Sequence, residues 1–93
     1  MDSAYKIDSI KNNVLKEYLK NHYEHILVNY NGDDYITKNA LSNIHTLDLS
    51  NSSLSSLEGI EMFSNLYNIN LANNKIKDVS ALNDLVIIEK KTI

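Results

Sequence analysis

Residues 44–65, IHTLDLSNSSLSSLEGIEMFSN, and residues 66–87, LYNINLANNKIKDVSALNDLVI, are two consecutive segments of equal length that decide the fold. Aliphatic residues recur at the same places in both segments, 22 positions apart. The matching pairs are Ile44 and Leu66, Leu47 and Ile69, Leu49 and Leu71, Leu54 and Ile76, Leu57 and Val79, and Ile60 and Leu82. Six pairs at one offset indicate an internal repeat, which predicts an architecture of stacked units.

The repeated pattern, L-x-x-L-x-L-x-x-N-x-L, resembles the leucine-rich repeat, and its 22-residue length resembles the repeats of bacterial internalins. Residues 57–66, LEGIEMFSNL, are similar to the stretch that follows the amino-terminal cap of bacterial leucine-rich repeat proteins. The resemblance implies an α+β fold: a short leucine-rich repeat solenoid with two full repeats, a partial third, short parallel strands and a helical N-terminal cap. We expect residues 1–93 to form a single domain, with the cap in 1–43 and the repeats in 44–93.

Each L-x-L segment predicts a short parallel strand, over residues 46–50 and 68–72, with its aliphatic side chains in the core. Alternation then places the intervening residues on the concave face: Thr46, Asp48, Ser50, Asn68, Asn70 and Ala72. The chain is expected to return along the convex side through Leu54, Leu57, Ile60 and Phe63, and again through Ile76, Val79, Leu82 and Leu85. The resemblance implies that the Asn74 amide bonds backbone groups of neighbouring turns, whereas Ser52 holds that place in the first repeat.

A third strand is predicted to begin at residues 86–88. Its pattern is incomplete, because Lys91 falls where Leu47 and Ile69 stand in the full repeats. No carboxy-terminal cap is recognisable in the sequence. An uncapped apolar end favours pairing with another chain, so we expect a homodimer through this end or its coverage by a partner.

The amino-terminal residues predict a helical cap within 9–28, with Asp8 or Ser9 as its N-cap. Its apolar stripe consists of Ile10, Val14, Leu15, Tyr18, Leu19, Tyr23, Ile26 and Leu27. One helix and two helices both fit this stripe. Packing on the first repeat accounts for the stripe, and binding to a membrane surface is the alternative.

Residues 29–41 contain the turn signals Asn31 and Gly32, and Thr37 can cap a short helix. The segment resembles a degenerate calcium loop, but Ala40 replaces the bidentate glutamate. An ordinary turn and a weak calcium site are therefore both open. His22 and His25 have a spacing that two metal ligands can use on a helix, but no third ligand is evident, so we predict no metal site.

Composition narrows the classes of function. The formal net charge is −3, from nine lysines and twelve acidic residues with no arginine, and no basic stripe of a nucleic-acid-binding protein is present. Cysteine is absent, which excludes disulfides and thiolate metal sites. The residues after Met1 show neither a basic region nor an apolar one, and we expect a cytoplasmic protein.

Leucine-rich repeats act by binding, usually through the concave face, so we predict a protein partner and no catalytic residues or cofactors. The predicted partner-binding residues are Asp48, Glu58, Glu61, Tyr67, Asn68, Asn70, Asp78 and Asp84. Tyr67 has the residue type of a binding hot spot, although it can equally pack at the strand edge. The acids after each strand form either one negative side, aimed at a basic groove, or an ordinary solvated edge.

Two functions fit these observations. The first is a small cytosolic inhibitor, similar in size, charge and composition to phage-encoded anti-CRISPR proteins, that binds a nucleic-acid-handling effector through an acidic surface. In that case the partner is a CRISPR effector with a basic RNA-binding groove. The second is the amino-terminal part of a bacterial surface adhesin built from leucine-rich repeats.

Overall fold

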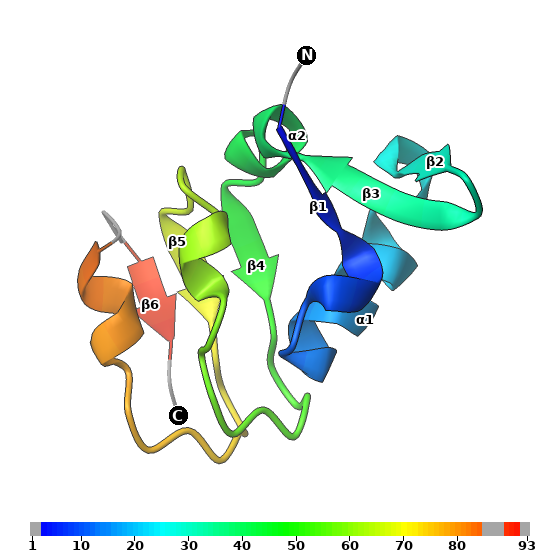
Figure 1. The fold of residues 1–93 in the computed structure, drawn as a ribbon. Coiled ribbons are helices and arrows are strands. Elements are labelled where there is room, and N and C mark those ends of the chain that lie inside the picture. Colours follow the sequence, from blue (N-terminus) through cyan, green and yellow to red (C-terminus); the bar gives the residue numbers. More distant parts are fainter. Residues whose placement is uncertain (1–2, 85–88, 92–93) are drawn as a thin grey trace.

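The computed structural model describes residues 3–84 and 89–91 and has an α+β architecture with two small sheets (Figure 1). In chain order its elements are β1 (Ala4–Lys6), the 3₁₀ turn η1 (Ile7–Ser9), helix α1 (Asn13–His22), η2 (Glu24–Ile26), β2 (Val28–Tyr30), β3 (Asp33–Thr37), α2 (Lys38–Ser42), β4 (Thr46–Asp48), η3 (Ile60–Met62), β5 (Asn68–Asn70), η4 (Ser80–Asp84) and β6 (Glu89–Lys91). No helix among the described residues is both long enough and apolar enough to cross a bilayer.

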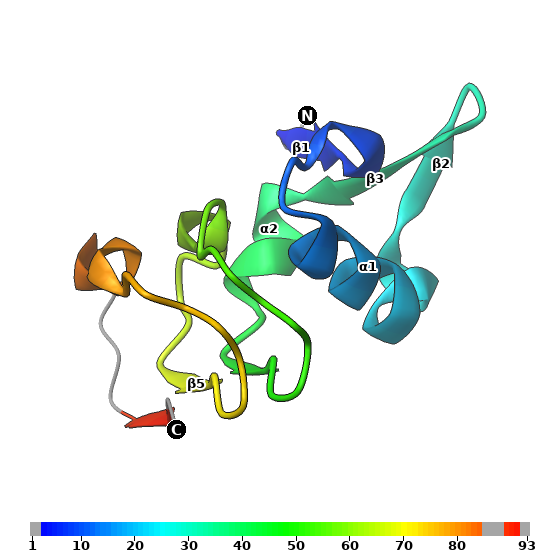
Figure 2. The ribbon, with the colours of Figure 1, turned by 90° about the horizontal axis from the view of Figure 1, so that it is seen from below.

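An antiparallel sheet with the strand order β1-β3-β2 forms much of the amino-terminal part. The predicted turn is confirmed: Asn31 and Gly32 both have positive φ, 53° and 85°, and join β2 to β3 as a two-residue hairpin loop. The hairpin extends away from the repeats (Figure 2). Residues 1–43, predicted as a helical cap, therefore contain three strands besides the helices, and the sequence did not predict these strands.

Helix α1 begins later and ends earlier than the predicted segment 9–28. Asp8 and Ser9 do not cap it, since they belong to the 3₁₀ turn η1. The cap is Asn12, whose Oδ1 accepts the backbone N–H of Leu15 at 3.4 Å. After α1 the chain makes a second 3₁₀ turn, η2, so one α-helix and one short turn occupy the predicted stripe.

Helix α2 is short and begins where the sequence predicts. The Thr37 side chain accepts the backbone N–H of Ala40 at 3.0 Å, which confirms Thr37 as the N-cap. Leu41 in this helix is buried and leads the chain into the first repeat.

A parallel sheet with the order β4-β5-β6 carries the repeats. Leu47 lies opposite Ile69, which confirms the 22-residue offset between β4 and β5. Lys90, and not Lys91, lies opposite Ile69 in the next pair, so β5 and β6 are 21 residues apart and the predicted alignment of the third strand is wrong by one residue. Residues 85–88, including the predicted strand start, lie outside the described part of the chain.

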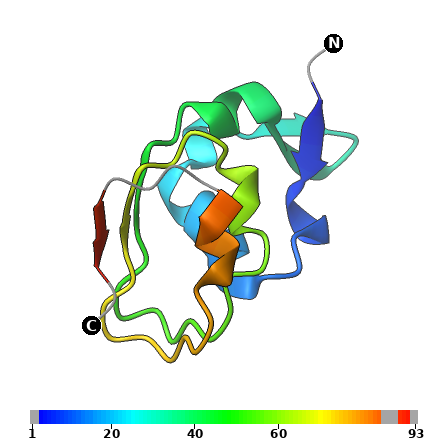
Figure 3. The same cartoon turned by 90° about the vertical axis from the view of Figure 1, so that its left-hand side faces the viewer.

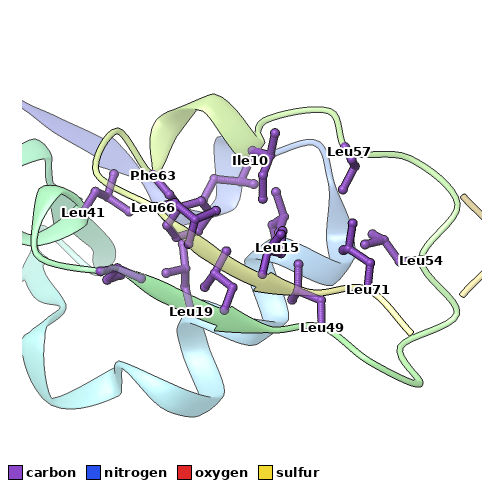
Figure 4. Packing of buried hydrophobic residues seen from close by; sticks show 14 of the residues in the cluster. Ile10, Leu15, Leu19, Leu41, Leu49, Leu54, Leu57, Phe63, Leu66 and Leu71 are labelled. Carbon is purple, nitrogen blue, oxygen red and sulfur yellow. The ribbon is translucent and has the colours of Figure 1, made fainter. Parts of the chain in front are cut away.

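The strands line one side of the winding chain and the 3₁₀ turns η3 and η4 line the other (Figure 3). Between them lies one hydrophobic cluster that runs from the amino-terminal part into both repeats (Figure 4). The members of this cluster are Ile7, Ile10, Leu15, Leu19, Ile36, Leu41, Ile44, Leu47, Leu49, Leu54, Leu57, Ile60, Phe63, Leu66, Ile69, Leu71 and Leu82. Helix α1 contributes two fully buried leucines, Leu15 and Leu19, to this cluster.

The apolar side chains of the return path are buried in the first repeat and only partly buried in the second. Leu57 and Ile60 are buried, as predicted. Their equivalents differ, since Leu82 is buried but Val79 is 36% exposed.

Candidate functional site

The outward residues of β4 and β5 form a polar surface, here called the strand face, that consists of Thr46, Asp48, Asn68 and Asn70. They alternate with Leu47 and Ile69, which are buried beneath them. Three of the predicted partner-binding residues, Asp48, Asn68 and Asn70, therefore lie together on adjacent strands. A row of short polar side chains over a packed apolar layer is well suited to hydrogen bonding with another chain.

An aromatic pair adjoins the strand face where β4 and β5 begin. His45 and Tyr67 are one repeat apart, and their rings stack with centroids 5.6 Å apart and an interplanar angle of 21°. The pair is held in place because His45 Nδ1 lies 3.2 Å from the backbone oxygen of Asn65. Tyr67 remains 43% exposed. The sequence singled out Tyr67 but missed His45, although their equivalent positions in the two repeats could have linked them.

Asp48 and Asn70 also have local structural tasks at equivalent places. Asp48 Oδ1 accepts the backbone N–H of Ser50 at 3.0 Å and its hydroxyl at 2.6 Å. Asn70 Oδ1 accepts the backbone N–H of Ala72 at 3.0 Å. These contacts end each strand with a side-chain turn. One acceptor atom of each side chain is thus already engaged in its own strand end.

Tyr18 connects helix α1 to the strand face. Its hydroxyl hydrogen-bonds the backbone of Asp48, and its ring centroid lies 4.3 Å from that of His22. Burial raises the pKa of Tyr18 above its ordinary value, although the hydrogen bond to Asp48 opposes the rise. The helix therefore borders the strand face on the β4 side.

A second group of predicted residues, Glu58, Glu61 and Asp78, lies on the opposite side of the repeats, which we call the return side. Glu58 and Asp78 line one open hollow between the repeats, and Glu58 and Glu61 line a neighbouring one next to the amino-terminal part. Asp84 lies in η4, but its side chain is outside the described part of the structure. The predicted residues with described side chains therefore lie on two surfaces, the strand face with its adjoining aromatic pair and the return side.

Lysines share the return side with these acids. Lys75 and Lys77 line the hollow that contains Glu58 and Asp78, and Lys11 lines the hollow that contains Glu61. The three acids are thus interleaved with three lysines among the described lining residues. A surface with this balance presents a weaker negative field than the spacing of the acids alone predicts.

Asp78 has a structural task as well. Its Oδ1 accepts the backbone N–H of Ser80 at 2.8 Å, and this bond, with a further one from the Ser80 side chain, lowers the pKa of the Asp78 carboxyl below its ordinary value. One repeat earlier, the Ser56 hydroxyl accepts the N–H of Glu58 at 3.1 Å. The same turn is therefore built at the same place in both repeats, with a serine in one and an aspartate in the other.

The sequence has two candidate places for metal binding: the calcium-loop-like segment 29–41 and the His22–His25 pair. In the structure, residues of both make other contacts. Asn29 and Asp33 lie on paired strands, where the Asn29 amide donates to Asp34 at 3.1 Å and Asp33 pairs with Lys6 at 3.2 Å. The His22 ring lies against the Tyr18 ring at an interplanar angle of 31°. Within residues 3–84 and 89–91, no group of three or more histidines and acids is arranged to hold a metal ion.

Residues 42–84 match the family model described as Leucine Rich repeats (2 copies). No curated protein matches the chain. The matched residues include β4, β5 and their return paths, so this segment is similar to two leucine-rich repeats. Such repeats generally mediate protein–protein interactions and are typically non-catalytic.

Proposed function

We propose that this chain, with its two leucine-rich repeats, is a non-catalytic module that binds a protein partner through the strand face and the adjoining His45–Tyr67 pair. The observation that supports this best is the combination of an exposed aromatic residue, held by stacking, with a row of polar side chains on two rigid strands. Tyrosine is one of the residue types enriched among binding hot spots. Because the strands are anchored by buried Leu47 and Ile69, little ordering is needed on binding.

We propose further that the repeats form a short solenoid in one domain, with residues 1–43 as its amino-terminal cap. The support is local. Asn12 Nδ2 donates to the backbone oxygens of Ser56 and Glu58 at 3.0 and 2.9 Å, and Asn65 Nδ2 donates to the oxygen of Ser42 at 2.9 Å. These bonds, together with the shared hydrophobic cluster, join the cap to the first repeat.

The finer proposal is a cytoplasmic inhibitor of the anti-CRISPR type that binds the basic groove of a nucleic-acid-handling effector. It requires a negative surface, and the return side offers the exposed carboxylates Glu58, Glu61 and Asp78. The lysines among them reduce that field, so the geometry favours the strand face as the main contact. A surface adhesin remains the alternative, and the genes that neighbour this one separate the two proposals.

The experiment is a pull-down from host lysate with three variants of the full chain. Tyr67→Ala combined with Asn68→Ala, here called the strand-face variant, changes the strand face and the adjoining His45–Tyr67 pair. Glu58→Lys combined with Glu61→Lys reverses charge on the return side, and Asp78 is left intact because it closes a turn. Glu17→Lys is the matched control, since Glu17 is an exposed acid on α1.

We expect a partner that the wild type and the control capture, and that the strand-face variant loses by at least about tenfold. Loss only with the return-side variant would assign binding to the acidic surface and support the inhibitor. Capture by both variants at wild-type level would overturn both surfaces. Circular dichroism of each variant checks that the fold is retained.

A homodimer through the carboxy-terminal end is a separate proposal. Its support is the place of β6 at the outer edge of the parallel sheet, which leaves one side of that strand without a neighbouring strand in the described sheet. Light scattering of the full chain over a range of concentrations tests it, and a strict monomer at the highest concentration would rule it out.

A further inference from the structure

We infer that strand β2 pairs with β2 of a second copy of this chain, so that the two antiparallel sheets join into one continuous sheet. Strand β2 lies at the edge of its sheet, after β1 and β3. All three of its residues are exposed, including Val28 at 51% and Tyr30 at 66%. The two apolar side chains share one face of the strand, because they alternate with Asn29.

This edge lacks the features that normally prevent strands from pairing. Edge strands are usually protected by charged residues, proline or a covering element. The sequence of β2 is Val-Asn-Tyr, with no charge and no proline. The opposite edge, β1, carries Lys6, which pairs with Asp33 at 3.2 Å. Lys38 lies 5.9 Å from the centroid of the neighbouring Tyr5 ring. Of the two edge strands of the β1-β3-β2 sheet, only β1 contains a charged residue.

The backbone pattern fixes which residue pairs with the second copy. A two-residue loop joins β2 to β3, so Tyr30 and Asp33 are the hydrogen-bonded pair next to the turn. Val28 and Tyr35 are the next such pair, two residues away. Asn29, which lies opposite Asp34, therefore directs its backbone N–H and C=O to the free edge. Two copies related by a two-fold axis at Asn29 exchange these two hydrogen bonds.

The side chains are self-complementary in this register. Antiparallel pairing centred on Asn29 places Val28 of each copy opposite Tyr30 of the other, and aromatic with β-branched residues form favourable cross-strand pairs. On the same face, Tyr35 lies next to Val28 within each copy. The pairing therefore continues a stripe of apolar side chains across both molecules, and covers the two most exposed large hydrophobic residues of the described chain.

Charge is compatible with the arrangement. The acids nearest the edge are Asp33 and Asp34, which already contact Lys6 and Asn29 in their own copy. The two Asp34 residues are separated by three strand spacings, roughly 14 Å, which exceeds the Debye length at physiological salt. No like charges lie directly opposite each other. Because each strand has only three residues, the contact is smaller than a standard interface and the dimer is weak.

Sedimentation velocity of the full chain, from about 10 μM to about 1 mM, tests the inference. We expect a concentration-dependent dimer. Asn29→Pro removes the outward donor but none of the β2–β3 backbone bonds, and Tyr30→Lys adds a charge to the edge. Each variant should weaken the dimer at least tenfold. Ala4→Lys is the matched control, since Ala4 is an exposed small residue on β1, and it should leave the dimer unchanged.

Amide chemical shifts provide the second readout. We expect the Asn29 N–H to shift with concentration, whereas the N–H of buried Ile36 stays constant. A strict monomer at about 1 mM would overturn the inference. A dimer of equal strength in Tyr30→Lys would also overturn it, and would favour the alternative dimer through the edge strand β6. Because Tyr30 is exposed, this variant keeps the fold and remains informative even if Asn29→Pro unfolds the hairpin.

Discussion

The side-chain Nδ2 of Asn74 lies 2.7 Å from the backbone oxygen of Leu49, which belongs to the preceding repeat. The Oδ1 of the same side chain accepts the N–H of Ser52 at 3.0 Å and that of Leu54 at 2.9 Å, also in the preceding repeat. The amide further donates to Leu71 within its own repeat at 3.1 Å. One half-buried side chain thus joins the two repeats, as the sequence resemblance implied.

We predict that Asn74→Ala lowers the free energy of unfolding by about 3 kcal/mol, because several part-buried backbone groups lose their partner. Urea unfolding followed by circular dichroism measures the change. Asn21→Ala is the control, since Asn21 is exposed on α1, and it should cost less than about 0.5 kcal/mol. Equal effects of the two variants would contradict a stacking role for Asn74.

We predict that Asn12→Ala destabilises the protein by about 1–2 kcal/mol, because it removes the N-cap of α1 and both bonds to the first repeat. Asn13→Ala, one residue later and exposed, should have little effect. Thermal unfolding of both variants provides the comparison. A loss confined to α1, with the repeats unchanged by hydrogen exchange, would show that Asn12 does not couple the two parts.

We predict that Gly59→Ala and Gly32→Ala cost similar amounts, about 1–2 kcal/mol each, since both glycines have positive φ of 90° and 85°. A Cβ at Gly59 would lie 3.5 Å from Leu15 Cδ1, an ordinary contact distance, and a Cβ at Gly32 would meet nothing within 4 Å. Backbone strain therefore sets both costs. A much larger loss for Gly59→Ala in chemical denaturation would mean that packing against Leu15 dominates.

We predict that the stability contributed by Asp78 depends on pH. Its folded-state pKa lies below the ordinary value of 3.8, so the contribution is complete above that value and is lost as the pH falls through the folded-state pKa. Asp78→Asn should therefore lower Tm most near neutral pH and least in strong acid. Carbon-detected NMR titration gives the pKa directly.

The two hydrogen bonds from Ser80 cause this shift, so the donor residue can be tested separately. Ser80→Ala removes the hydroxyl only and should return the Asp78 pKa part of the way to its ordinary value. Ser80→Pro also removes the backbone N–H and should return it further. An Asp78 pKa that is the same in all three proteins would contradict the hydrogen-bond origin.

The repeats could be predicted from sequence because their side chains are periodic. Leu47 and Ile69 are opposite each other as the 22-residue offset requires, and Thr37 caps α2 as its position indicates. These features depend on local chemistry or on one repeated spacing. The register of β6 could not be predicted in this way, because the repeat pattern breaks at Lys91. In the structure β5 and β6 pair with an offset of 21 residues.

The amino-terminal part was harder to predict because its strands form by pairing over distance. Ala4 lies opposite Thr37, a partner far along the chain. A strand of three residues is too short for a periodic pattern that would predict such a pairing. The charge of the return side was also hard to predict, because it depends on which residues meet across the two repeats. The sequence shows acids after each strand, but only the structure shows that Lys75 and Lys77 return to the same hollow as Glu58 and Asp78.

The bonds from Asn12 to Ser56 and Glu58 join residues 44 and 46 positions apart in the chain. During synthesis on the ribosome, helix α1 emerges from the exit tunnel well before these two acceptors do. At a few to about twenty residues per second, the helix waits for seconds with two leucines uncovered. Translation speed between α1 and the first return path therefore sets how long the helix remains without these two hydrogen-bond partners.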